Sequence, residues 1–167
     1  MKIFKNLLMF LPSKIAYAHC DIPCGIYDPY VLQRAAHTII RMTQLLTDIK
    51  SDTSTSSGQV TKRAAHDIAR MTCVKEEHAS ILEEELETLR NDYFKEEHFK
   101  QYSNLNELFT KTLKAASGAR QEINMQAAEE TLAGAQEIAE IFFKTKNVEP
   151  VRVKSVYPTG GEIILHK

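Results

Sequence analysis

Two cysteines and a histidine lie within six residues near the start of the chain: His19, Cys20 and Cys24. Thiolates and an imidazole together form a soft ligand set for a transition metal. Pro23 restricts the backbone before Cys24 and Gly25 frees it afterwards, so the segment can form a hook with both sulfurs directed at one centre. This spacing indicates a metal site. A Cys20–Cys24 disulfide and two unrelated free thiols are the alternatives.

The residues before His19 have the character of a removable leader. A basic start precedes a short apolar stretch at 7–11, and residues 16–18 (AYA) resemble the cleavage site of a secretory signal. The apolar stretch is short and Lys14 separates it from the cleavage site, so export is the less favoured interpretation. We expect residues 1–18 to be removed, which would make His19 the N-terminus.

Cleavage before His19 would change the ligand set. The new α-amine, the amide nitrogen of Cys20 and the sulfurs of Cys20 and Cys24 can occupy the corners of a square, and the imidazole of His19 can add an axial bond. Square-planar donation by nitrogen and sulfur suits Ni(II) or Cu(II), whereas zinc prefers a tetrahedron. The hypothesis is therefore a nickel or copper site at a processed N-terminus.

The elements that must position this site are helical. Apolar residues recur at steps of three and four over about residues 30–49, 60–90, 105–118 and 123–144. Helices joined by short loops predict an all-α, antiparallel four-helix bundle. In the second helix, we expect Cys73 to be a buried small hydrophobe and Glu83–Glu85 to form a solvated face.

The C-terminal residues follow a different pattern. Residues 151–157 alternate with period two, residues 158–161 (PTGG) form a turn signal, and an apolar run follows at 163–165. This predicts a small hairpin that must dock on the bundle or stay mobile. The expected organisation is a leader (1–18), a metal-binding hook (19–29), a four-helix bundle (30–146) and a C-terminal extension (147–167).

Composition excludes several classes of protein. The 167 residues suit one domain, and 21 basic against 22 acidic residues argue against a nucleic-acid-binding protein. No apolar run approaches the roughly 18 residues needed to span a bilayer, so we expect no membrane association. Three cysteines are too few for a disulfide-stapled scaffold.

The segment 19–29, HCDIPCGIYDP, resembles the N-terminus of the nickel superoxide dismutases. The resemblance extends through 91–95 (NDYFK) and 112–115 (TLKA) and covers roughly residues 19–146. It implies a four-helix bundle that assembles as a homohexamer, with one nickel ion per subunit and dismutation of superoxide to dioxygen and hydrogen peroxide. It also implies that a dedicated maturation peptidase removes the leader, without export, which places the protein in the cytoplasm.

The resemblance also implies roles for the residues of the hook. His19, Cys20 and Cys24 would be the metal ligands, with the axial imidazole of His19 bound to Ni(III) and released from Ni(II). Two thiolates and a deprotonated amide are the strong anionic donors that a trivalent state needs.

The same family pattern implies further site residues around the metal. Tyr27 and Tyr93 would order water beside it, Asp21 would support them, and Lys95 would attract the superoxide anion. Taken without the motif, the tyrosines are ordinary half-buried aromatics, Asp21 caps a turn and Lys95 is a solvated surface lysine.

Two positions depart from the family. Its axial imidazole is commonly backed by a glutamate of the first helix, but the matching stretch, Gln33-Arg34-Ala35, contains no carboxylate. His78 stands where the family often has arginine, and we interpret it as a substitute.

Three other functions can be compared with this interpretation. A ferritin-like di-iron protein needs Glu-x-x-His on its helices, but the residues three positions before the helical histidines are all basic: Arg34, Arg63, Lys75 and Lys95. A nickel or copper carrier with the same hook remains the alternative, although it has no use for Tyr27 and Tyr93 beside the metal. A helical interaction protein would leave the eleven-residue match unexplained.

Overall fold

A computed structural model describes residues 25–52 and 61–167. The elements in chain order are α1 (Tyr30–Asp52), α2 (Lys62–Thr88), the π-helical turn η2 (Leu89–Tyr93), α3 (Glu96–Gln101), α4 (Leu105–Gln121), α5 (Met125–Thr145), β1 (Pro150–Lys154) and β2 (Glu162–His166). None of the helices in these described ranges is long and apolar enough to cross a membrane.

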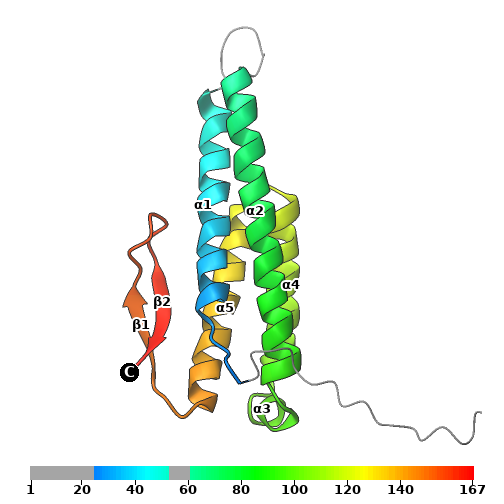
Figure 1. Cartoon of the computed structure of the whole chain (residues 1–167), viewed down its shortest axis with the longest axis vertical. Coiled ribbons are helices and arrows are strands. Elements are labelled where there is room, and N and C mark those ends of the chain that lie inside the picture. Colours follow the sequence, from blue (N-terminus) through cyan, green and yellow to red (C-terminus); the bar gives the residue numbers. More distant parts are fainter. Residues whose placement is uncertain (1–24, 53–60) are drawn as a thin grey trace, which may run out of the picture.

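The four long helices form an antiparallel bundle, as the sequence predicted (Figure 1). Helix α1 packs against α2 and α5, and α4 packs against the same two helices from the other side. All four helices contribute to the largest fully buried apolar side chains: Leu32, Ile39, Leu82, Leu86, Leu105, Phe109 and Ile138; Leu89 of η2 and Ile164 of β2 are also among them. Figure 1 shows that α1 and α2 extend past the ends of α4 and α5.

The helix ends agree with local sequence signals. The Thr61 hydroxyl accepts a hydrogen bond from the Ala64 amide (3.1 Å) at the start of α2, and the Asn124 side chain accepts one from the Ala127 amide (3.0 Å) at the start of α5. Such caps satisfy amides that have no partner within the helix. Just beyond the end of α5, Asn147 adopts a left-handed φ of 59°, a conformation that asparagine tolerates and that commonly ends a helix.

A buried lysine joins α2 to the end of α4. Lys75 is only 2% exposed, and its ammonium donates hydrogen bonds to the carbonyls of Ala119 (2.6 Å), Arg120 (3.0 Å) and Glu122 (2.6 Å). An ammonium has three protons to donate, and the last carbonyls of a helix lack partners within it. The three donors of Lys75 therefore match the three carbonyls at the end of α4. Burial lowers the pKa of Lys75.

Two expectations for α2 are wrong. Cys73 is exposed rather than buried. Position 73 lies two residues from Lys75, about 200° around the helix, and the inward face at this height is the one that carries Lys75. The run Glu83–Glu85 is only partly solvated, because Glu83 is half-buried and forms an ion pair of 2.8 Å with Arg120 of α4.

The predicted C-terminal hairpin is present and docks on the bundle. Strands β1 and β2 pair antiparallel, with Arg152 opposite Ile164. The Ile164 side chain is fully buried. The side chain of Gln33, on α1, bonds both backbone groups of Ile164: its amide group donates to the carbonyl (3.0 Å) and its oxygen accepts from the N–H (2.7 Å).

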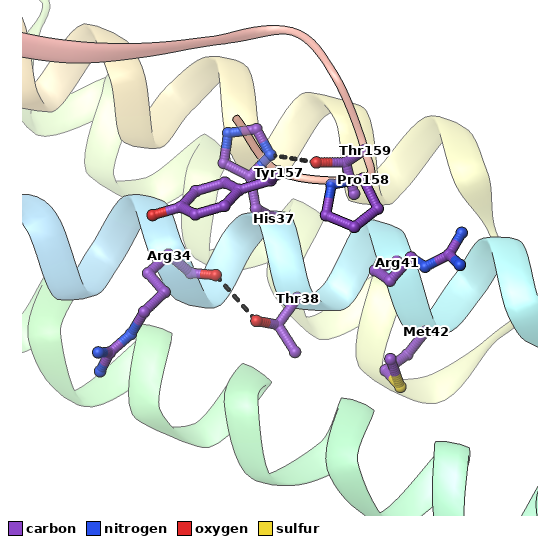
Figure 2. A pocket seen from close by; sticks show the side chains of 8 residues that line it. All are labelled: Arg34, His37, Thr38, Arg41, Met42, Tyr157, Pro158 and Thr159. Atoms are coloured by element: carbon purple, nitrogen blue, oxygen red, sulfur yellow. Dashed lines mark hydrogen bonds between the residues drawn. The ribbon is translucent and has the colours of Figure 1, made fainter. Parts of the chain in front are cut away.

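A buried histidine of α1 holds the turn of the hairpin. His37 Nε2 lies 3.3 Å from the carbonyl oxygen of Glu162, and Nδ1 lies 2.8 Å from the hydroxyl of Thr159 (Figure 2). A carbonyl only accepts, so Nε2 carries the proton and Nδ1 accepts from Thr159. Burial lowers the pKa of His37, which keeps the ring in this neutral form.

Candidate metal centre

Four of the predicted site residues, His19, Cys20, Asp21 and Cys24, lie outside the described residues. Within residues 25–52 and 61–167, no group of three or more His, Cys, Asp or Glu side chains is placed to hold a metal ion. The hook therefore remains the metal-ligand set that the sequence offers. The described structure shows the residues that follow these ligands in the chain and the side chains that pack against them.

The two predicted site tyrosines lie together. Tyr27 is three residues after Cys24 and precedes α1, whereas Tyr93 ends the π-helical turn after α2. Their ring centroids are 5.6 Å apart and their planes are inclined by 55°. Both residues are half-buried and pack against the hydrophobic core. The fold thus brings the Asn-Asp-Tyr-Phe-Lys stretch to the segment that follows the hook.

A π-helical turn places Tyr93. The amide of Phe94 donates to the carbonyl of Leu89 at 2.9 Å, a five-residue step in place of the four-residue step of an α-helix. The wider turn ends α2 with Leu89 and Phe94 buried in the core and Tyr93 at its edge. The helical periodicity of the sequence stops near residue 90, and no sequence signal marks the turn.

The hydroxyl of Tyr93 has a defined direction. Oγ1 of Thr145 donates to the carbonyl of Phe142 (2.7 Å), so its single proton is already used. The Tyr93 oxygen lies 2.6 Å from the same Oγ1 and is therefore the donor. Burial raises the pKa of Tyr93. The phenol stays protonated at neutral pH.

Aromatic side chains and one ammonium surround the Tyr93 ring. Phe142 lies 4.5 Å away between centroids, Phe94 lies 4.9 Å away, and the His98 ring stacks at 5.9 Å. The ammonium of Lys146, at the end of α5, lies 4.8 Å from the Tyr93 centroid. The sequence analysis missed Lys146, because nothing local distinguishes it from other surface lysines.

A cavity of about 250 Å³ opens beside the tyrosine pair. Its lining joins the segment before α1, the end of α5 and the hairpin: Tyr27, Asp28, Tyr30, Phe142, Phe143, Lys146, Val148 and His166. The His166 ring, from β2, lies 5.0 Å from Phe143. The C-terminal hairpin thus contributes to the wall of this cavity.

Lys95, the predicted anion-attracting residue, is exposed at the start of α3. Its ammonium donates to the Asp92 carbonyl (2.6 Å), and its backbone amide donates to Nδ1 of His98 (3.0 Å). These contacts fix the turn that follows Tyr93.

Two carboxyl groups lie near the start of α1. The Asp28 carboxylate accepts a hydrogen bond from the Tyr30 amide at 2.8 Å. Glu85 of α2 is half-buried, and burial, together with the negative charges of Asp28 and Glu84, raises the pKa of its carboxyl. The segment between the hook and α1 therefore has a carboxyl group of α2 as a neighbour.

The departures from the family pattern have clear structural settings. Ala35 is buried in the core of the bundle, at 1% exposure. His78 is half-buried on α2, with Nδ1 2.9 Å from the carbonyl oxygen of Val74. Because a carbonyl only accepts, Nδ1 carries the proton and Nε2 keeps a free lone pair. His78 can therefore accept a hydrogen bond, as a carboxylate would.

A second cavity, of about 170 Å³, lies between α1 and the hairpin turn (Figure 2). Its charged lining residues are Arg34 and Arg41, whose guanidinium groups point away from each other in Figure 2. Tyr157 packs edge-on against His37, with centroids 5.0 Å apart. Because the two guanidinium groups point apart, they do not form an anion site. We assign this cavity to the packing of the hairpin turn against α1.

The chain was compared with known proteins. A sequence model described as nickel-containing superoxide dismutase matches residues 14–146. The nickel-type superoxide dismutase of Streptomyces coelicolor is 30% identical over 138 residues, covering 83% of this chain and 95% of that protein. That of Streptomyces seoulensis is 30% identical over 142 residues, with coverage of 83% and 95%.

Solved structures give the same result. The native structure of nickel superoxide dismutase aligns with a TM-score of 0.64 and 30% identity, over 77% of this chain and 99% of that chain. Its apo structure aligns with a TM-score of 0.62 and 28% identity, over 74% and 99%. The sequence match, the bundle and the tyrosine pair agree: the chain belongs to the nickel-containing superoxide dismutase family.

Proposed function

We propose that this chain dismutates superoxide at a nickel ion, one per subunit, held by His19, Cys20 and Cys24. In the reaction, two superoxide anions and two protons give dioxygen and hydrogen peroxide. The observation that carries the proposal is the contact of Tyr27 with Tyr93, 5.6 Å between centroids, directly after the hook sequence. In the sequence, Cys24 precedes Tyr27 by only three residues.

The donor set fits nickel. The thiolates of Cys20 and Cys24, a terminal amine and a backbone amide nitrogen would hold the ion, and the imidazole of His19 would add a further nitrogen; nickel accepts such a set of nitrogen and sulfur donors. When bound, nickel supplies one-electron redox chemistry by alternating between its divalent and trivalent states. The family membership of the chain favours this metal over copper.

The residues around the hook then have defined tasks. Tyr27 and Tyr93 order water and limit the space in which superoxide can lie. Tyr93 remains a neutral phenol, because burial raises its pKa, and its hydrogen bond to Thr145 holds it in place. We assign Asp21 the support of this arrangement and Lys95 a favourable field for the anion.

The imidazole of His19 would need a different support from that in the family. Ala35 has no polar group, so we propose His78 as a partial substitute, acting through the lone pair on Nε2 that its bond to the Val74 carbonyl leaves available. A hydrogen-bond acceptor behind a metal-binding imidazole fixes its orientation and raises its basicity.

Maturation and assembly complete the proposal. We propose that a peptidase removes residues 1–18, that the mature chain forms a homohexamer and that it works in the cytoplasm. The family match begins at residue 14, before His19, which supports a shared precursor form. Ile26 is 73% exposed and Tyr30 is 39% exposed, and apolar side chains beside the hook suit a contact with a second subunit.

The test is the mass, metal content and activity of the purified protein. The proposal predicts loss of residues 1–18, one nickel ion per chain and consumption of superoxide. A precursor that keeps residue 18 should be inactive even with added nickel, because the His19 nitrogen is then an amide. Nickel bound without turnover would instead support the carrier alternative, and full turnover by the uncleaved chain would contradict the amine ligand.

A further inference from the structure

We infer that Gln33 is a positioning residue for Tyr27 and that it couples the C-terminal hairpin to the tyrosine pair. The inference rests on the proposed function, and it assigns to the hairpin the support of the segment between the hook and α1. Three observations carry it: the hydrogen bonds of a single buried amide, a row of ring contacts beside them, and the anchoring of the hairpin on α5.

The side-chain amide of Gln33 joins the hairpin to the residue before α1. Its nitrogen donates to the carbonyls of Ile164 (3.0 Å) and Pro29 (3.3 Å), and its oxygen accepts from the Ile164 N–H (2.7 Å). Both amide protons and the oxygen are therefore used. Gln33 is 2% exposed and Pro29 is also buried. A buried polar bridge whose partners are all present is rigid.

Pro29 lies where a shift of the backbone would reach the site. Tyr27 precedes it by two residues, and the Tyr27 ring packs against that of Tyr93 with centroids 5.6 Å apart. The pyrrolidine ring fixes φ of Pro29, and a proline also restricts the conformation of the residue before it. Few free torsions therefore separate the Pro29 carbonyl from Tyr27. Holding this carbonyl limits where the tyrosine ring can lie.

A row of rings makes a second connection from the hairpin to the same segment. His166 of β2 packs against Phe143 of α5 with centroids 5.0 Å apart. Phe143 in turn packs against Tyr30, the first residue of α1, with centroids 6.0 Å apart. All three rings line the cavity that opens beside Tyr27. The hairpin therefore reaches the start of α1 by two routes.

The hairpin can hold this segment because it is also fixed to α5. Arg152 of β1 forms an ion pair of 2.6 Å with Glu140, and Gln136 donates to the carbonyl of Glu162 in β2 at 2.6 Å. Strand β1 begins after residue 146, where the family match ends. The support that we assign to the hairpin therefore comes from a part of the chain outside that match.

The alternative is that the hairpin only stabilises the bundle, to which the buried Ile164 contributes. Thr159 provides a matched control for this case. It lies in the hairpin turn, 2.8 Å from Nδ1 of His37, and joins the hairpin to α1 away from Pro29. Thr159→Val therefore weakens docking and leaves the Gln33 bridge intact. Gln33→Met keeps the length of the side chain and removes all three hydrogen bonds of the bridge.

The first experiment uses the full chain free of nickel and measures nuclear Overhauser effects between the rings of Tyr27 and Tyr93. We expect Gln33→Met to weaken these signals and to move the amide shifts of residues 25–28, while Thr159→Val leaves both unchanged. His166→Ala, at an exposed position, removes the second connection and should weaken the signals to a smaller extent.

Two results would overturn the inference. One is an unchanged Tyr27–Tyr93 signal in folded Gln33→Met or, should that variant not fold, in His166→Ala. The other is an equal loss of signal in Thr159→Val, which would show that any loosening of the hairpin has the same effect. Circular dichroism of each variant establishes that it is folded.

The second experiment compares kcat of the nickel-loaded variants. We expect Gln33→Met to lower kcat about three- to tenfold at unchanged nickel content, because a displaced side chain beside the reacting centre slows the reaction without removing a ligand. Thr159→Val should leave kcat unchanged, and equal values in the two variants would overturn the role of Gln33 in the reaction. A chain that binds nickel but does not consume superoxide would refute the proposed function, while the ring signals would still decide whether Gln33 positions Tyr27.

Discussion

The phenol of Tyr93 donates a hydrogen bond to Oγ1 of Thr145 across 2.6 Å. The two residues are 52 positions apart in the chain, at the end of the π-helical turn and in the last turn of α5. Because Thr145 in turn donates to the Phe142 carbonyl, the end of α5 sets the direction of the Tyr93 hydroxyl. A residue remote from the hook in sequence therefore holds one of the tyrosines that we assign to the site.

Thr145→Val removes the acceptor while keeping the shape of the side chain. We expect the variant to be about 1 kcal/mol less stable to unfolding, because a partly buried hydrogen bond is lost. We also expect kcat/KM to fall by about tenfold through misplacement of the phenol, with unchanged nickel content. Thr110→Val, on the exposed face of α4, is the control. Equal kinetics for the Thr145 variant and the control would remove Thr145 from any role in positioning.

The metal ligands can be separated by their effects. Cys20→Ser or Cys24→Ser should abolish both activity and the thiolate-to-nickel absorption. His19→Ala keeps the terminal amine, the amide and both sulfurs, so nickel content should stay substantial while turnover collapses. Cys73→Ser is the matched control, because Cys73 is exposed on α2. Near-native activity in either thiol variant would show that the ligand set is wrong.

His78→Ala tests the substitute for the missing carboxylate. Losing a hydrogen-bond partner of a metal-binding imidazole typically costs on the order of 10–100-fold in affinity or activity. Because His78 compensates only in part, we expect activity to drop toward the lower end of that range without release of nickel. His66→Ala, at an exposed position of the same helix, should have no effect. An unchanged rate for His78→Ala would leave the nickel assignment intact and exclude His78.

His37 should make the docking of the hairpin dependent on pH. Burial lowers its pKa below the ordinary value of 6.5, so below that value the unfolded chain binds more protons than the folded chain. The stability from His37 is therefore complete above about pH 6.5 and decreases as the pH falls toward the lowered pKa. Urea unfolding at pH 7.5 and 5.5 should show a smaller difference for His37→Gln than for the original chain. The same difference in both proteins would assign the pH dependence to other groups.

Lys75→Met should destabilise the bundle. The change leaves the carbonyls of Ala119, Arg120 and Glu122 without the ammonium that bonds them, and an unsatisfied buried polar group costs about 1–3 kcal/mol. We expect a loss of about 2–3 kcal/mol in the free energy of unfolding, measured by denaturant titration at neutral pH. Lys114→Met, at an exposed position of α4, should change it little. A Lys75 variant as stable as its control would show that water satisfies these carbonyls.

Local patterns account for what the sequence could predict. Periods of three and four gave the long helices, and alternation with a Pro-Thr-Gly-Gly turn gave the hairpin, because both kinds of element reflect residues close in the chain. The hook is also local: its donors lie within six residues. The family resemblance then directed attention to Tyr27 and Tyr93, and the fold brings their rings together.

The tertiary structure decided the contacts that join distant segments. Gln33 meets Ile164 across 131 positions, and Lys75 reaches the end of α4 across 44. Cys73 is of a residue type that is often buried. It is exposed because α2 turns the face that carries Lys75 and its buried neighbours toward the core. Lys146 resembled any lysine at a helix end until the packing of α5 against the π-helical turn placed it over Tyr93. The chemistry of the hook is local and can be read from residue types, whereas its surroundings depend on how the helices pack, which no single segment determines.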